Sequence, residues 1–188
     1  MKKKPKVAMV ISFRDFRDEE LFVPMEILNK AGIETKVISN KKGLAIGADG
    51  GEIEVNILAS ELKVEEFDAI IFIGGPGCLK NLDNEISYEI IRQTIHQGKI
   101  LAGICISPVI LAKAGALKGK RATVWSNSMD KSTIKILKEN RAIYQKEPVV
   151  VDGNIITSSG PSSAKDFAGT LDRILKKNIL ETGSADSR

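Results

Sequence analysis

The chain contains 188 residues, of which 43% are hydrophobic and 28% are charged, the composition of an ordinary soluble globular protein. Its net charge of +4 is spread along the chain, with a basic run only at residues 2–4, so we expect no nucleic-acid partner. No apolar segment approaches the length of a membrane span, and two cysteines do not make a disulfide framework, so we expect no membrane association and a reducing, cytoplasmic location.

Strand and helix signals alternate along the chain. Residues 6–12 (KVAMVIS) are continuously apolar, as expected of a strand covered on both faces, and residues 18–31 have helical periodicity up to a C-cap glycine at Gly32. The later elements are predicted in this order: a strand at 33–39, a Gly- and Lys-rich turn or short excursion at 40–52, a strand at 69–73, a helix at 85–97, a strand at 99–104, a helix at 107–114, a short strand at 122–125, a helix at 131–140, a hairpin at 149–157 and a helix at 162–177.

This alternation predicts an α/β fold with a doubly wound, mainly parallel sheet and helices on both faces. We expect one domain over residues 1–180 and a disordered polar tail at 181–188. In such sheets ligands bind beyond the carboxyl ends of the strands. The segments that follow the strands at 69–73 and 99–104 should therefore lie side by side at a binding site.

Residues 103–107 (GICIS) follow the second of these strands and have the form of a nucleophile elbow, a sharp strand-to-helix turn that exposes one side chain. The turn would point backbone N–H groups at Cys105, and the start of the helix would favour its thiolate. Free cysteine is also among the most buried residue types, so the alternative is a small packed side chain.

Residues 74–77 (GGPG) directly follow the strand at 69–73. Pro76 has no N–H, so a backbone donor aimed at the site must come from Gly75 or Gly77. Gly75 together with Ile106 could supply a pair of oxyanion donors. The alternative is a plain tight turn.

Glu20 is the unusual acid of the helix at 18–31, because helical spacing places it on an apolar stripe with Pro24 and Ile27. Glu19 and Glu26 fall on a mostly polar stripe. A buried carboxyl is costly unless it has a partner, and burial should raise its pKa and can keep it protonated.

As a set and in order, these motifs resemble the DJ-1/ThiJ/PfpI superfamily: Glu20 four residues before Pro24, FIGGPG at 72–77, GICISP at 103–108 and TSSGP at 157–161. The resemblance runs from about residue 6 to residue 177 and implies a flavodoxin-like, glutamine-amidotransferase-like fold.

The resemblance also implies the roles of individual residues. It makes Cys105 the reactive cysteine, Glu20 the protonated acid that donates a hydrogen bond to its thiolate, and Gly75 and Ile106 the oxyanion-hole amides. A homodimer or a higher homo-oligomer is usual in the superfamily. The expected pocket residues are Gly74, Trp125, Ser159 and Gly160.

The chain departs from the superfamily at its histidines. Ile106 stands where the protease-like branch has a histidine, and Trp125 stands where the deglycase-like branch has one. The only histidine, His96, should lie at the opposite edge of the sheet from Cys105, because a strand of five or six residues spans roughly 16–20 Å. We therefore predict no same-chain Cys–His dyad.

The resemblance, taken with this departure from it, implies three candidate functions. The first is a glyoxalase- or deglycase-type enzyme that acts on a small reactive carbonyl compound without a cofactor or metal. The second is a redox-sensing stress protein or chaperone without turnover. The third, a PfpI-type peptidase or amidase acting on peptides, is disfavoured because proton delivery to a leaving amine has no visible donor. Cys78 is interpreted as an incidental loop cysteine, with a resolving thiol near the site as the alternative.

Overall fold

The computed structural model describes residues 4–185, with side chains as far as residue 178. Its centre is a seven-stranded sheet in the order β11-β12-β8-β7-β1-β3-β6. All neighbouring strands are parallel except β11 and β12, which form the predicted hairpin. The strands are β1 (Lys6–Ile11), β3 (Glu34–Ser39), β6 (Ile57–Leu58), β7 (Ala69–Phe72), β8 (Ile100–Ile104), β11 (Val149–Asp152) and β12 (Ile155–Ser158).

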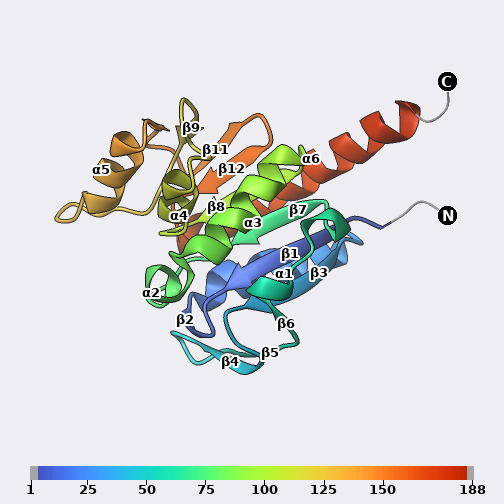
Figure 1. The fold of residues 1–188 in the computed structure, drawn as a ribbon, viewed down its shortest axis with the longest axis horizontal. Coiled ribbons are helices and arrows are strands. Elements are labelled where there is room, and N and C mark those ends of the chain that lie inside the picture. Colours follow the sequence, from blue (N-terminus) through green and yellow to red (C-terminus); the bar gives the residue numbers. More distant parts are fainter. Residues whose placement is uncertain (1–3, 186–188) are drawn as a thin grey trace.

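Helices cover both faces of this sheet (Figure 1), as the alternating pattern predicted. On one face the buried side chains come from α1 (Asp18–Lys30) and α6 (Ala164–Ala185), which pack against each other. On the other face they come from α3 (Glu85–His96) and α4 (Pro108–Lys113). Strands buried from both sides explain the continuous apolar runs in the sequence.

The prediction of a turn at residues 40–52 is wrong. This segment and its neighbours form a second, three-stranded sheet of β2 (Arg14–Phe16), β4 (Gly43–Gly47) and β5 (Glu52–Val55). Glycines and exposed polar side chains hid the strand pattern here. The turn between β4 and β5 is attached to the start of α1, because the Asp18 carboxylate accepts hydrogen bonds from the backbone N–H groups of Asp49 (2.8 Å) and Gly51 (2.5 Å).

The predicted strand at 122–125 is also shorter than expected, because β9 (Arg121–Ala122) pairs with β10 (Ile143–Tyr144) over only two residues. Beyond Ala122 the backbone bonds to other partners: the Thr123 N–H donates to the side-chain oxygen of Thr157, and the Trp125 N–H donates to the carbonyl of Cys105. The remaining elements are α2 (Cys78–Leu82), α5 (Ser132–Glu139) and the short 3₁₀ turns η1 (Ala59–Glu61), η2 (Val64–Glu66) and η3 (Pro161–Ser163).

The last helix is longer than predicted. It was expected to end near residue 177, but α6 runs to Ala185 and includes residues 181–185 of the predicted tail. Residues such as Thr182, Gly183 and Ser184 have low helix propensity, so the pattern alone did not indicate that the helix continues. Residues 186–188 lie outside the described part of the chain. None of the described helices is long and apolar enough to cross a bilayer.

Candidate active site

Cys105 sits at the predicted elbow between β8 and α4, with a left-handed backbone at φ +64°. A non-glycine residue in this region is strained and persists only where its surroundings hold it. Here the Cys105 N–H donates to the Ser158 carbonyl at 2.9 Å, and the Cys105 carbonyl accepts from the Trp125 N–H at 2.8 Å. The side chain is 9% exposed, so the sulfur is mostly enclosed but not sealed.

Ser107 fixes the turn that follows the cysteine. Its buried hydroxyl accepts from the Ile104 N–H at 2.9 Å and lies 2.7 Å from the Phe72 carbonyl oxygen, to which it can donate. Phe72 ends β7 and Ile104 ends β8, so this one side chain joins the carboxyl ends of both strands. The segments after β7 and β8 therefore lie side by side, as predicted.

Glu20 brings a carboxyl group to the thiol from the first turn of α1. Its side chain is fully buried, whereas Glu19 and Glu26 are exposed. Oε2 accepts a hydrogen bond from the Gly74 N–H at 3.0 Å. Burial raises the pKa of Glu20 to about 7, against the lowering effects of a hydrogen bond with the Cys105 thiol, the Gly74 amide and the Arg17 charge. A proton is therefore available on this carboxyl near neutral pH.

The Gly-rich turn after β7 supplies one of the expected backbone donors. The Gly77 N–H donates to the Asp15 carbonyl at 3.0 Å, which leaves Gly75 to face the sulfur. The backbone N–H groups of Gly75 and Ile106 both hydrogen-bond to Cys105. Gly75 has φ +112°, and a Cβ there would lie 2.4 Å from the backbone nitrogen of Arg17, so this position requires glycine.

One electrostatic expectation is corrected by this geometry. The start of α4 was expected to favour the thiolate, but burial and the charge of Glu20 raise the pKa of the Cys105 thiol, and the Gly75 and Ile106 amides lower it less. The carboxyl and the thiol must therefore be treated as one coupled pair. A thiolate forms here at the lowest cost when the remaining proton of the pair is on Glu20.

A cavity of about 250 Å³ opens over the sulfur. It is lined by Arg17, Gly75, Pro76, Cys105, Ile106, Trp125 and Pro161. Trp125 is thus at the cysteine, where it was expected. Ser159 and Gly160 instead line a larger neighbouring cavity, and Gly74 lies behind the reactive groups, between Cys105 and Glu20.

Arg17 was not singled out from the sequence, although it contributes to this site. It is the N-cap residue of α1, its N–H donates to the Gly74 carbonyl at 3.1 Å, and its guanidinium forms an ion pair with Asp49 at 3.1 Å. The sequence offered only its place three residues before Glu20, which is no signal by itself.

The other two candidate groups, His96 and Cys78, do not line the cavity over the Cys105 sulfur. His96 ends α3, before β8 begins at Ile100, whereas Cys105 follows the far end of that strand. Cys78 begins α2 near the site, but it is fully buried and burial raises the pKa of its thiol. Among the residues with described side chains, no group of three or more His, Cys, Asp or Glu residues is placed to hold a metal ion.

Gly74→Ala tests the close packing behind the thiol. The added Cβ would lie 2.7 Å from both the Cys105 Cβ and Glu20 Oε2, and 2.9 Å from the Ile104 carbonyl oxygen. We expect a loss of about 1–3 kcal/mol in unfolding free energy and slower alkylation of Cys105, measured by urea unfolding and iodoacetamide labelling. Gly169→Ala is the control, because nothing lies within 4 Å of a Cβ in that exposed helical position. An unchanged labelling rate in Gly74→Ala would contradict the prediction.

Comparison with known proteins places this arrangement in a family. The model of the DJ-1/PfpI family matches residues 5–173. An uncharacterised protein of Methanocaldococcus jannaschii is 39% identical over 177 residues, covering 94% of this chain and 85% of that protein. A Pyrococcus furiosus protein named deglycase PfpI is 32% identical over 169 residues, covering 89% and 98%.

Solved structures agree with the fold. A ThiJ/PfpI domain protein from Brachyspira murdochii superimposes with a TM-score of 0.87 at 35% identity, covering 93% of this chain and 99% of that chain. The flavodoxin-like α/β fold expected from the sequence is thereby confirmed. The family model spans most of the chain, and all three of these similar proteins exceed 30% identity over about nine-tenths of it, so the chain belongs to the DJ-1/PfpI family.

Proposed function

We propose that the chain is a cysteine-dependent enzyme of the glyoxalase or deglycase type, acting on 2-oxoaldehydes. The observation that carries this proposal is the convergence of the Cys105 sulfur, the Glu20 carboxyl and the Gly75 and Ile106 amides beside one small cavity. Relatives named deglycase PfpI (32% identical) and glutathione-independent glyoxalase DJR-1.2 of Caenorhabditis elegans (28% identical) support it.

The first step forms a hemithioacetal. The Cys105 thiolate attacks the aldehyde carbon, and the electron pair of the C=O π bond moves to the oxygen. That oxygen takes the proton of Glu20, while the Gly75 and Ile106 N–H groups stabilise the negative charge that develops on it. Glu20 is left as a carboxylate, next to the new carbon–sulfur bond.

The second step converts the adduct into a thioester without a net change in atoms. Glu20 removes the proton from the former aldehyde carbon, giving an enediolate, and returns it to the neighbouring carbon. The hydroxyl proton on the former aldehyde oxygen moves to the oxygen of the neighbouring carbon, which leaves a thioester carbonyl beside a hydroxyl group. Water then attacks the thioester, and the carbon–sulfur bond breaks to restore the Cys105 thiolate. One proton of the water returns to Glu20, the other is released to solvent, and the 2-hydroxy acid leaves as its anion. Each turnover consumes one dicarbonyl and one water and needs no histidine.

Turnover of methylglyoxal to lactate tests this function. Purified protein is expected to form lactate in proportion to enzyme, and Cys105→Ser is expected to form none above the uncatalysed rate. Cys78→Ser is the matched control, because it also replaces one cysteine by serine but at a fully buried position away from the cavity. It should form lactate at the rate of the parent protein. Lactate formation at the same rate in the Cys105→Ser variant would reject the proposal.

Oxidation sensing is the second candidate, favoured by the difference between the two cysteines. Cys105 is 9% exposed and touches an acid, whereas Cys78 is 0% exposed. A thiolate displaces water from one hydrogen peroxide to become sulfenate, and a second peroxide gives sulfinate. Mass spectrometry after mild peroxide should find Cys105 oxidised well before Cys78; equal oxidation of both would count against this role.

A peptidase or amidase is not proposed for the single chain, because His96 lies at the far edge of the sheet. Such chemistry would need an acid–base group from a second copy of the chain in a homo-oligomer.

A further inference from the structure

A second and larger cavity adjoins the cysteine pocket. It measures about 790 Å³, within the usual range for small-molecule sites. The chemistry proposed for Cys105 uses none of its polar side chains. Its lining residues bearing hydroxyl groups or charges are Thr123, Ser126, Lys131, Tyr144, Lys146, Glu147, Ser159, Ser162, Ser163 and Asp166.

Thr123 gives this cavity an unmet hydrogen-bonding group. The residue is 0% exposed, yet its Oγ1 has no hydrogen-bond partner among the described residues. A buried hydroxyl without a partner costs free energy. This hydroxyl lies just behind the cavity wall, so a ligand hydroxyl that displaces the wall slightly would give it the missing hydrogen bond. The backbone of Thr123 is fixed by a 2.9 Å hydrogen bond from its N–H to the Thr157 hydroxyl, so the residue is rigidly placed.

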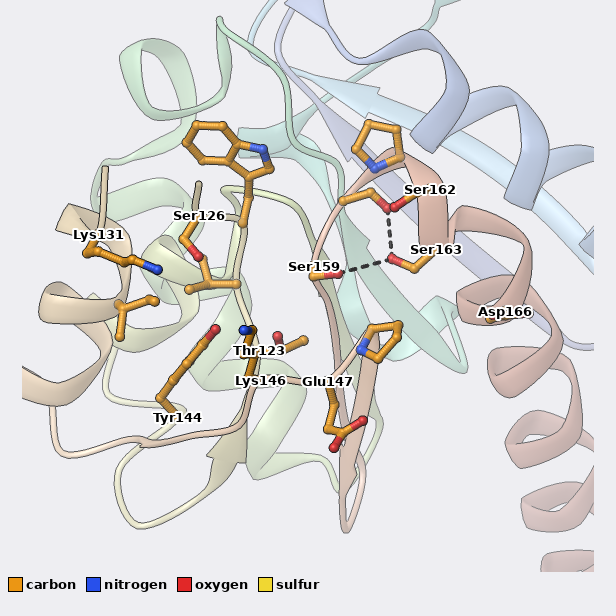
Figure 2. Close-up of a pocket in the computed structure, with 16 residues that line it drawn as sticks. Thr123, Ser126, Lys131, Tyr144, Lys146, Glu147, Ser159, Ser162, Ser163 and Asp166 are labelled. Carbon is orange, nitrogen blue, oxygen red and sulfur yellow. Dashed lines mark hydrogen bonds between the residues drawn. The ribbon is translucent and has the colours of Figure 1, made fainter. Parts of the chain in front are cut away.

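Two lysines and a tyrosine approach the same hollow. Figure 2 shows Lys131, next to α5, and Tyr144 and Lys146, from and after β10, on the side opposite Ser159 and Ser163. Within the described part of the chain, neither lysine forms an ion pair. The two acids of the lining lie apart from them, since Figure 2 shows Glu147 directed away from the two lysines and Asp166 on α6, across the cavity.

The two cavities share part of their walls. Trp125 and Pro161 line both of them. Trp125 is also hydrogen-bonded to the elbow, because its backbone N–H donates to the Cys105 carbonyl at 2.8 Å. Its own carbonyl accepts from the Thr133 hydroxyl at 2.5 Å, in α5. A molecule held at the sulfur can therefore extend past Trp125 into the larger cavity.

We propose that the cavity beyond Trp125 binds the distal part of the substrate, a polyhydroxylated chain that ends in a phosphate. Thr123 and Tyr144 bind the hydroxyl groups, and Lys131 and Lys146 bind the phosphate. The substrate class is then a sugar-derived 2-oxoaldehyde phosphate, larger than methylglyoxal. This inference rests on the carbonyl chemistry proposed for Cys105, and it names the compound that brings the carbonyl there.

Binding without chemistry is the first test, so that it does not depend on turnover. Calorimetry with the Cys105→Ser protein uses sorbitol 6-phosphate, which has the chain and the phosphate but no carbonyl, with sorbitol and inorganic phosphate as comparisons. We expect sorbitol 6-phosphate to bind more tightly than either. Lys131→Gln with Lys146→Gln should weaken it about tenfold or more, and Thr123→Val about 2–10-fold.

A matched control separates the cavity from overall charge. Lys118 and Lys138 are exposed and do not line the cavity, so Lys118→Gln with Lys138→Gln removes the same charge elsewhere. Binding of sorbitol 6-phosphate should stay within twofold of the parent protein in this variant. Equal weakening in both double variants, or no binding of sorbitol 6-phosphate at 10 mM, would overturn the inference.

Turnover is the second test. The kcat/KM for 3-deoxyglucosone 6-phosphate is expected to exceed that for methylglyoxal at least tenfold, and Lys131→Gln with Lys146→Gln should reduce the former more than the latter. Methylglyoxal turnover without this preference would overturn the inference and leave the proposed function intact. Specific binding of sorbitol 6-phosphate with no turnover of any carbonyl would support the cavity and reject the chemistry.

Discussion

Replacing Glu20 by leucine is expected to slow alkylation of Cys105 by iodoacetamide about 100-fold at pH 7. Burial raises the pKa of the thiol, as does the Glu20 carboxylate when it is charged, and the backbone amides of Gly75 and Ile106 only partly offset this. In the parent protein a proton on Glu20 adds a third hydrogen bond to the sulfur anion. Without it the sulfur anion keeps only the two backbone amides, and the loss of one hydrogen bond to a charged group, worth up to about 3 kcal/mol, corresponds to a roughly 100-fold smaller thiolate fraction.

The pH profile carries the more specific part of this prediction. In the parent protein the alkylation rate should rise with pH and level off above about 7, where the coupled pair loses its first proton. Glu20→Leu should rise tenfold per pH unit through that range with no inflection. Glu20→Gln, which keeps the size of the side chain and a neutral donor but has no transferable proton, should also lack the inflection. A Glu20→Leu variant that reacts as fast as the parent at pH 7 would show that the acid does not assist the thiol.

The central sheet could be predicted from the sequence because both of its faces are buried. Continuous apolar runs such as residues 69–73 are typical of strands covered on both faces, and alternation with helices then sets their parallel direction. The hairpin of β4 and β5 could not be predicted in this way. Its register depends on contacts from outside the segment, notably the Asp18 carboxylate that accepts two of its backbone N–H groups.

The reactive groups were predictable for a similar reason, and the surrounding space was not. Cys105 stands out because it follows directly on a buried strand, and Glu20 stands out because it is a charged residue on an apolar helical stripe. The fold then brings the two side chains together. The balance of charge between them was not visible, because the thiol pKa depends on how completely the site excludes water. Of the larger cavity only Trp125, Ser159 and Gly160 were expected from the sequence. Its other walls come from α5, from the β10 region and from the start of α6, which no local pattern connects.

Stability should fall by about 3 kcal/mol between pH 4.5 and pH 7 because of Glu20 alone. Burial raises its pKa from an ordinary 4.5 to about 7, so within this window the folded protein holds a proton that the unfolded chain has lost. Unfolding free energy then decreases as pH rises, by about 1.4 kcal/mol for each pH unit between the two pKa values. Below pH 4.5 both states are protonated, and the contribution of this group is constant.

Urea unfolding at several pH values, compared between variants, measures this contribution. Glu20→Gln has no proton to lose, so the decrease from pH 4.5 to pH 7 should shrink by about 3 kcal/mol relative to the parent protein. Glu19→Gln is the matched control: the neighbouring glutamate is exposed, and its removal should leave the slope unchanged. Burial raises the pKa of Glu20, and the same proton gives both the pH dependence of stability and the inflection in the alkylation rate. Both effects must therefore disappear together in Glu20→Gln. A variant that loses one and retains the other would mean that burial of Glu20 and reactivity of Cys105 are separate properties, and the coupled pair proposed for this site would have to be abandoned.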